Sequence, residues 1–96
     1  MKLELPELAE NGNTVPLSVA VDAPEGARVQ EILVVAPANP NARVILFRFS
    51  PVSVPEASTR IRLAETQGVI AVAKLSDGTF FQATRQIKVT IGGCGG

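Results

Sequence analysis

Apolar and polar residues alternate with a period of two along most of this chain. In TVPLSVAVD, residues 14–22, the odd positions are apolar and Thr14, Ser18 and Asp22 are polar. That alternation is typical of a β-strand with one buried face. Further strand-like runs lie at 29–35, 43–49, 58–66, 69–75 and 79–91. No window shows the period of an amphipathic helix, so the pattern predicts an all-β protein.

Turn-forming residues separate these runs. Loops or turns are predicted at 10–13, 24–28, 36–41, 50–58 and 67–68, where Gly, Pro, Asn, Ser and Gln gather. Asp77 and Gly78 stand between two apolar runs, which is a strong β-hairpin signal. Strands at this spacing predict an immunoglobulin-like antiparallel β-sandwich of about six or seven strands over residues 1–91, without an internal disulfide.

The alternation also predicts which side chains face the core. Ile61 and Leu63 are expected to point inward, while Arg60 and Arg62 point to solvent. Arg85 interrupts the apolar face of the last run, so a bulge or a strand crossing the sheet edge is predicted there. The inward residues of that run are expected to be Phe81, Ala83, Ile87, Val89 and Ile91.

Composition narrows the classes of function. A chain of 96 residues, 46% of them hydrophobic, is sufficient for one packed domain. Nine Lys and Arg balance nine Asp and Glu, which argues against a nucleic-acid partner, because such proteins need a basic surface. The longest apolar run, VILF at 44–47, is too short for a membrane-spanning helix.

Candidate catalytic and metal-binding residues are scarce. The chain has no histidine and one cysteine, so it lacks the commonest general base and the ligands of an N/S zinc site. Its acidic residues are scattered rather than clustered as calcium ligands would be. We therefore expect no enzyme active site, no metal and no cofactor.

The last residues, IGGCGG, carry the most unusual feature. Cys94 is the only cysteine, and it is flanked by Gly92, Gly93, Gly95 and Gly96. Gly-rich segments are flexible, and five extended residues reach roughly 17 Å. Residues 92–96 are thus predicted to form a mobile arm beyond the domain. Because an ordinary thiol is only a few per cent thiolate near neutrality, Cys94 is expected to be a passive carrier that a partner activates.

The chain resembles the SoxY family. The ending KVTIGGCGG, together with ENGNTVPLSV, STRIRL and AVAKLSDG earlier in the chain, is similar to the sulfur carriers of the thiosulfate-oxidising Sox system. The resemblance implies that Cys94 is the covalent attachment point for thiosulfate-derived sulfur. It also implies that the glycines around Cys94 form the arm that carries the adduct between enzymes.

The resemblance implies partners and a compartment as well. These are a SoxZ-like protein forming a heterodimer, and the cytochrome, hydrolase and sulfur dehydrogenase components of the Sox system. The expected location is the periplasm. Family members normally begin with an export signal, whereas here Met1 is followed at once by the strand-like KLEL, so a shortened N-terminus is expected. Self-association through an exposed sheet edge or a disulfide is a further expectation.

Two alternatives explain the same ending. A ubiquitin-like sulfur carrier also ends in Gly-Gly, but that fold needs a long helix, which no window predicts, and it leaves Cys94 without a role. An interaction module could use Cys94 only for an intermolecular disulfide. The residues alone leave this second alternative open.

Overall fold

The protein is built from β-strands, and the computed structural model describes residues 1–93. Its eight strands are β1 (Lys2–Glu4), β2 (Leu8–Asn11), β3 (Val15–Ala20), β4 (Val29–Val35), β5 (Arg43–Arg48), β6 (Glu56–Ile61), β7 (Gln67–Leu75) and β8 (Phe80–Ile91). Alternating apolar residues produce these strands because each strand buries one face. Within residues 1–93, no helix is long and apolar enough to cross a membrane.

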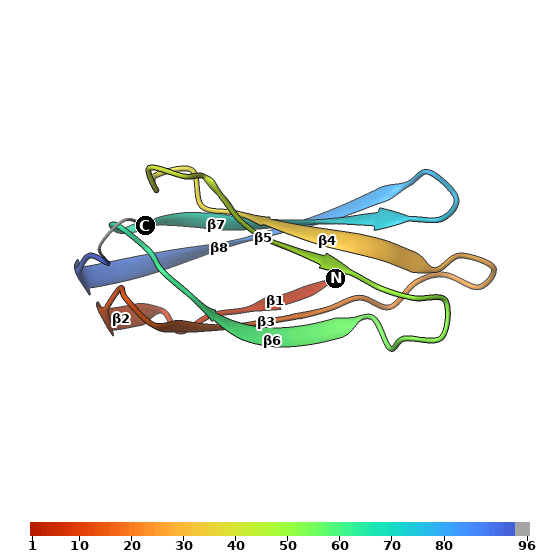
Figure 1. Cartoon of the computed structure of the whole chain (residues 1–96), viewed down its shortest axis with the longest axis horizontal. Helices are drawn as coiled ribbons and strands as arrows, with labels where there is room; N and C mark the ends of the chain where they lie inside the picture. Colours follow the sequence, from red (N-terminus) through yellow and green to blue (C-terminus); the bar gives the residue numbers. More distant parts are fainter. Residues whose placement is uncertain (94–96) are drawn as a thin grey trace.

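The strands form two sheets stacked face to face (Figure 1). The smaller sheet has the order β1-β3-β6, and the larger has the order β2-β8-β7-β4-β5. Neighbouring strands are antiparallel except β2 and β8, which are parallel. β8 is the longest strand and ends at Ile91, so the larger sheet leads directly into the C-terminal glycines.

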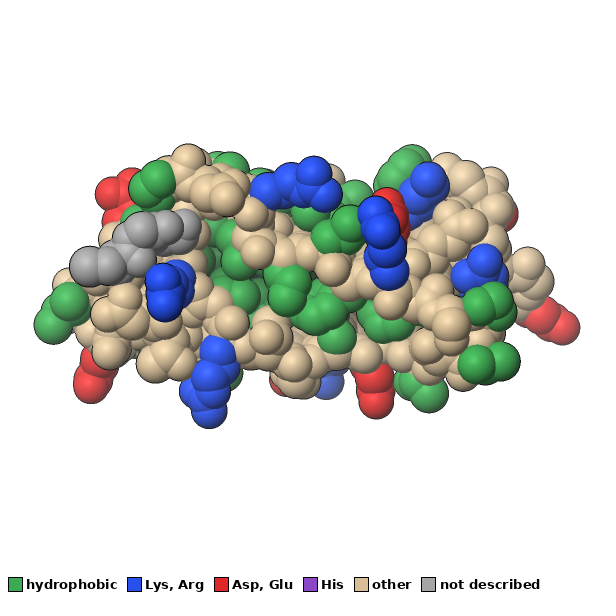
Figure 2. Space-filling view, viewed as in Figure 1, with side chains coloured by type: hydrophobic (Ala, Val, Ile, Leu, Met, Phe, Trp, Pro, Cys, Tyr) green, Lys and Arg blue, Asp and Glu red, His purple; other side chains and the backbone are tan. Residues whose placement is uncertain are grey.

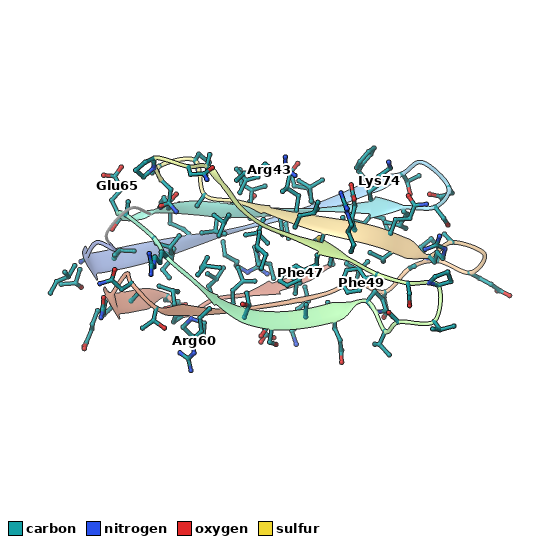
Figure 3. The ribbon with its side chains drawn as sticks, in the orientation of Figure 1. Arg43, Phe47, Phe49, Arg60, Glu65 and Lys74 are labelled. Atoms are coloured by element: carbon teal, nitrogen blue, oxygen red, sulfur yellow. The ribbon has the colours of Figure 1, made fainter. Side chains whose placement is uncertain are left out.

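The core lies between the two sheets. Its fully buried side chains include Leu17 from the smaller sheet and Ile32 and Ile87 from the larger sheet. Between β5 and β6 the two sheets leave an open seam, where apolar side chains gather at the centre of the view in Figure 2. Phe47 and Phe49 lie in this seam and pack against the core from its edge (Figure 3).

The structure confirms the predicted sandwich, with eight strands where about six or seven were predicted and with one parallel pair, β2 and β8. It also corrects several local predictions. Residues 67–68, predicted as a turn, belong to β7, and Gln67 is 6% exposed. Residues 10–11 are in β2, so only the second half of the predicted turn at 10–13 is a turn. The predicted strand at 58–66 begins earlier and ends at Ile61, although Ile61 and Leu63 are buried as predicted.

Arg85 does not cause a bulge. Its pairing with Val69 lies in a continuous register along β7 and β8. Within residues 1–93, the part of β8 before Lys88 is paired with β7 alone, and β2 pairs with the other side of β8 only from Lys88 onward. Arg85 therefore lies on a portion of β8 that forms an edge of the sheet. An arginine is tolerated there because its side chain reaches solvent. Ile91, predicted to face inward, is 66% exposed.

Candidate functional site

The C-terminal glycines leave the sandwich at a junction of three segments. β2 pairs with the end of β8, and this register places Asn11 beside Ile91. The chain then turns at Gly12, whose amide donates a hydrogen bond to the carbonyl of Ile91 at 2.7 Å. The short parallel strand therefore fixes the point at which β8 ends.

Two more backbone hydrogen bonds continue this arrangement into the tail. The amide of Leu63 donates to the carbonyl of Gly12 at 2.8 Å. The amide of Gly93 in turn donates to the carbonyl of Leu63 at 2.8 Å. Leu63 is fully buried, so its backbone is held in place by its side chain. The residue before Cys94 is thus hydrogen-bonded to the sandwich through the loop that follows β6.

Glycine is required at this junction because the backbones approach closely. A Cβ on Gly12 would collide with the carbonyl oxygen of Leu63, and a Cβ on Gly92 would collide with that of Ala64. A Cβ on Gly93 would lie 2.8 Å from the carbonyl oxygen of Gly12. Real Cβ atoms essentially never come so close to backbone atoms. We name Gly12, Gly92 and Gly93 the glycine junction.

A buried pair of amide side chains holds the loop after β6. Asn39 is 5% exposed, and its Nδ2 donates to the carbonyl of Arg62 at 2.8 Å. Its Oδ1 accepts from the amide of Ala64 at 2.8 Å and from Nε2 of Gln67 at 2.9 Å. These bonds flank Leu63 on both sides, so they set the position of the carbonyl that binds Gly93.

Gln67 links the same loop to the loop between β4 and β5. Its Oε1 accepts from the amide of Ala38 at 2.9 Å, and its Nε2 also donates to the carbonyl of Glu65 at 3.0 Å. Among the described residues, no buried side-chain nitrogen or oxygen lacks a hydrogen-bond partner. A fully satisfied buried network of this kind favours one arrangement of the loops.

The sequence-predicted site residues divide into two groups. Gly92 and Gly93 lie in the glycine junction, in contact with the sandwich. Cys94, Gly95 and Gly96 lie outside the described residues, so their roles stay predictions.

Sequence reasoning missed Gly12, Leu63, Asn39 and Gln67 as parts of the site. The turn residues Gly12 and Asn39 gave only a loop signal, because their partners are distant in the sequence.

Ionisable groups offer little chemistry near the junction. Within residues 1–93, no group of three His, Cys, Asp or Glu side chains could hold a metal ion. The pKa of Asp77 is lowered by hydrogen bonds from the side chain and the backbone of Thr79, but this pair lies in the hairpin between β7 and β8. The described part of the junction therefore provides contacts made by backbone and neutral side chains.

Comparison with known proteins points to sulfur metabolism. The chain matches the family described as sulfur oxidation protein SoxY over residues 1–94, a range that includes Cys94. It is similar to the structure of the sulfur carrier protein SoxY from Chlorobium limicola f thiosulfatophilum, with 37% identity and a TM-score of 0.78. That match covers 94% of this chain and 78% of the other. The curated proteins gave no match.

The fold also occurs in proteins of another class. A superoxide reductase (neelaredoxin) from Ignicoccus hospitalis is similar with a TM-score of 0.79 but only 17% identity, over 92% of this chain and 77% of that chain. A superoxide reductase (neelaredoxin) from Archaeoglobus fulgidus is similar with a TM-score of 0.69 and 13% identity, over 91% of this chain and 86% of that chain. At such low identity the likeness shows a shared sandwich and nothing about activity.

Proposed function

The chain belongs to the SoxY family of sulfur oxidation proteins, and we propose that it carries thiosulfate-derived sulfur covalently on Cys94. Family membership supports a role in sulfur oxidation as a sulfur carrier. The observation that most supports Cys94 as the attachment point is the family match itself, which extends to this residue. Cys94 is also the only thiol in the chain.

In the proposed loading step, a disulfide-type bond forms between Sγ of Cys94 and the outer sulfur of thiosulfate. The thiol loses its proton, and two electrons pass to the cytochrome component of the Sox system. A hydrolase then adds water to release sulfate, which leaves a persulfide on Cys94. A sulfur dehydrogenase then oxidises the outer sulfur of the persulfide to a sulfonate, taking oxygen from water and passing six electrons to its electron acceptor. A second hydrolysis releases sulfate and restores the thiol of Cys94. The carrier supplies the thiol, and its partners supply the oxidant and the catalytic groups.

The glycine junction supports the proposed arm. Gly92, Gly93, Gly95 and Gly96 would let the loaded thiol enter a narrow enzyme channel, because none of them has a side chain. In the described structure one hydrogen bond, from Gly93 to the carbonyl of Leu63, joins the first part of this arm to the loop after β6. Breaking that bond would release the arm without disturbing the core.

We also propose that the carrier works beside a SoxZ-like subunit in the periplasm. The SoxY family implies a place in the Sox system and a SoxYZ partnership. Each further component, the cytochrome, the hydrolase and the dehydrogenase, would meet the same arm in turn.

Intact-mass measurement tests the carrier role. The protein is incubated with thiosulfate and a Sox cytochrome complex, and its mass is measured before and after treatment with reductant. We expect a reductant-labile sulfur adduct that maps to Cys94 and is absent from Cys94→Ser, with both proteins equally folded. Thiosulfate oxidation by the serine variant in a reconstituted system would end the proposal. A doubled mass from disulfide dimers as the only product would favour the interaction-module alternative.

A further inference from the structure

The open seam between β5 and β6 is bordered by one edge of each sheet. In the part of the chain that the structure describes, β5 pairs with β4 alone and β6 with β3 alone, so neither strand has a partner on the seam side. Such edges can accept an added strand through backbone hydrogen bonds. The floor between them is apolar and includes Phe47 and Phe49 (Figure 2, Figure 3). The seam therefore combines backbone edges with an apolar floor, as a site for an extended chain requires.

A pocket of about 280 Å³ lies at the end of this seam nearest the glycine junction. Its lining includes Arg43, Val44 and Ile45 from β5, and Arg60, Ile61 and Arg62 from the end of β6. Sites for whole small molecules are larger, ~300–1,000 Å³, so this pocket fits a few side chains of a chain that crosses it. Arg62 directly precedes Leu63, whose carbonyl binds the amide of Gly93. The pocket is therefore adjacent to the first part of the arm.

On the larger sheet, the arginine at this pocket has no charged neighbour on the adjoining strand. Arg48, farther along β5, lies opposite Glu31 of β4 and forms an ion pair with it at 3.8 Å. Arg43 instead lies opposite Val35. Figure 3 shows Arg43 at the upper rim of the seam. Its positive charge is thus not balanced across the strand pair.

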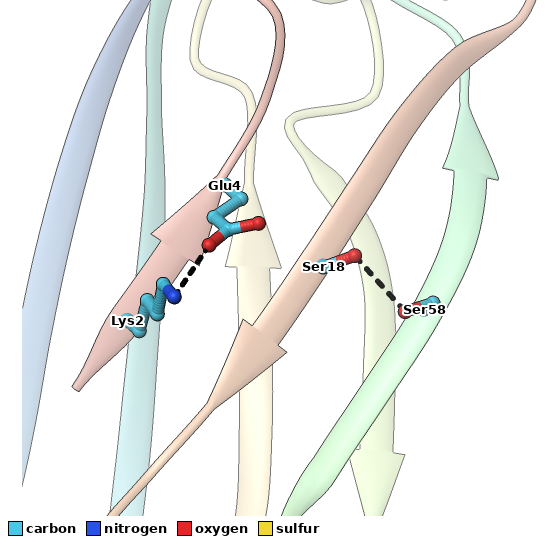
Figure 4. Close-up of polar contacts among 4 residues, drawn as sticks. All are labelled: Lys2, Glu4, Ser18 and Ser58. Carbon is cyan, nitrogen blue, oxygen red and sulfur yellow. Dashed lines mark hydrogen bonds and ion pairs between the residues drawn. The ribbon is translucent and has the colours of Figure 1, made fainter.

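The smaller sheet repeats this contrast at the lower rim. Figure 4 shows polar side chains of its outer face that are paired with one another: Lys2 with Glu4 at 2.8 Å, and the hydroxyls of Ser18 and Ser58 at 2.9 Å. Arg60, two residues after Ser58 on the same face, lies opposite Pro16, which has no polar side chain. Within residues 1–93, the side chains of Arg43, Arg60 and Arg62 make no ion pair or hydrogen bond. Three unbalanced positive charges thus gather at one end of the seam.

Protection of a sheet edge does not account for these arginines. Charged side chains on edge strands often prevent unwanted pairing. Arg85 on the free edge of β8 fits that role, because its Nη1 donates to the carbonyl of Thr84 at 2.9 Å and so occupies an edge acceptor. The side chains of Arg43, Arg60 and Arg62 make no such bond to the edges beside them. They remain available to acidic groups from outside the chain.

We propose that the seam binds an extended acidic segment of a second protein, which adds to the edge of β6 as a strand. Alternate side chains of that segment would enter the pocket beside Ile45, because residues of a strand point to opposite faces in turn. The others would face outward as cross-strand neighbours of Arg60 and Arg62, where opposite charges stabilise pairing. The importance of this location rests on the proposed function, since the bound protein would be held beside the arm that carries Cys94.

A second copy of this chain would be a poor occupant. The long free edge of β8, residues 80–87, contains no Asp or Glu and includes Arg85. Pairing one seam with another would bring the arginines of both copies together, and such like-charge contacts are unfavourable. The charges therefore favour a different protein with acidic side chains.

Synthetic peptides test the proposal without a natural partner. The probe is a blocked peptide of alternating Val and Glu, about six residues long like a typical strand, and its control has Lys in place of Glu. Each is titrated into the Cys94→Ser protein and followed by the amide NMR signals at low and physiological salt. The acidic peptide should bind at least about tenfold more tightly than the Lys peptide, shift the signals of β6, and weaken with salt.

Two further comparisons separate strand addition from simple charge attraction. The same acidic peptide with methylated backbone amides cannot donate to a strand edge, so it should lose most of its affinity. Arg60→Gln combined with Arg62→Gln should weaken binding about fivefold or more. The matched control, Arg85→Gln with Lys88→Gln, removes the same charge from another strand and should change affinity less than about twofold.

Several results would overturn the proposal. These are equal binding of the two peptides, full affinity of the methylated peptide, signal shifts confined to the free edge of β8, or equal losses in the two double variants. The comparison of peptides needs no substitution at the seam, so it holds even if an arginine variant folds poorly. Because the titrated protein lacks the thiol, every outcome is independent of sulfur loading on Cys94, which is followed separately by mass.

Discussion

The two ends of the sandwich use glycine for opposite reasons. At the end where β8 leads into the tail, Gly12, Gly92 and Gly93 have no room for a Cβ, because backbone atoms of other segments occupy that space. At the far end, Gly26 and Gly78 have open space around them and positive φ angles of 85° and 86° (Figure 1). The first set is required by tertiary contacts, and the second by the local geometry of turns.

Polar side chains repeat this contrast. At the tail end, Asn39 and Gln67 are buried and are joined by a hydrogen bond across 28 positions of sequence. At the far end, Asp77 and Thr79 are exposed and only two positions apart, and Phe80 beside them is 62% exposed. A change at the tail end should therefore disturb several segments together, whereas a change at the far end should act on one turn.

The largest effect is expected from Gly12→Ala. The added methyl group would collide with the carbonyl of Leu63, and both backbones are held by hydrogen bonds, from Leu63 to Gly12 and from Gly12 to Ile91. We therefore expect a loss of about 3 kcal/mol in the free energy of unfolding. Urea denaturation measures this value. Gly26→Ala is the control, since its cost comes from φ alone and should be about 1 kcal/mol. Equal losses in the two variants would contradict the distinction between the ends.

Gly92→Ala should affect the arm more than the fold. Its Cβ would collide with the carbonyl of Ala64, and the tail can relieve this collision by leaving the sandwich. We expect faster hydrogen exchange at the amide of Gly93 as its bond to Leu63 is lost, with little change in the urea midpoint. Unchanged exchange at Gly93 would show that the glycine junction tolerates a side chain.

Asn39→Ala should lower the free energy of unfolding less than Gly12→Ala does, but it should still affect the distant amide of Gly93. It leaves the carbonyl of Arg62, the amide of Ala64 and Nε2 of Gln67 without this partner, and such losses cost about 2 kcal/mol. Urea denaturation and exchange at the Gly93 amide measure the two consequences. Asn41→Ala, in the same loop but exposed, is the control and should be nearly neutral. Loss of stability without faster exchange at Gly93 would show that the hydrogen bonds of Asn39 and Gln67 do not hold the arm in place.

The contrast between the ends also explains which features the sequence could predict. Alternation of apolar residues is local, so it predicted the sandwich and the burial of Ile61 and Leu63. The hairpin at Asp77-Gly78 was predicted because its chemistry is local too. The glycine junction was not predicted, because the need for glycine there comes from the close approach of residue 12 to residues 63 and 92–93, which are distant in the sequence. Gln67 looked like a turn residue because its buried partner lies in a distant loop.

The smallest effect is expected at Asp77. Hydrogen bonds from the hydroxyl of Thr79 at 2.6 Å and from its amide at 3.0 Å lower the pKa of this carboxyl below its ordinary 3.8. A lowered pKa in the folded state adds stability that is present above the ordinary pKa and is lost as the pH falls through the folded value. Asp77→Asn should remove this dependence while keeping an acceptor for the Thr79 hydroxyl.

The urea midpoint of the native protein and of Asp77→Asn is measured between pH 6 and pH 2. The other carboxyl groups contribute equally to both proteins, so the difference between the two midpoints reports on Asp77. We expect the native protein to lose slightly more stability than Asp77→Asn below about pH 4. The exchange rate of the Gly93 amide, at the other end, should be the same in the two proteins. A change there would mean that the hairpin and the glycine junction are coupled through β8, which the independent contacts of the two ends argue against.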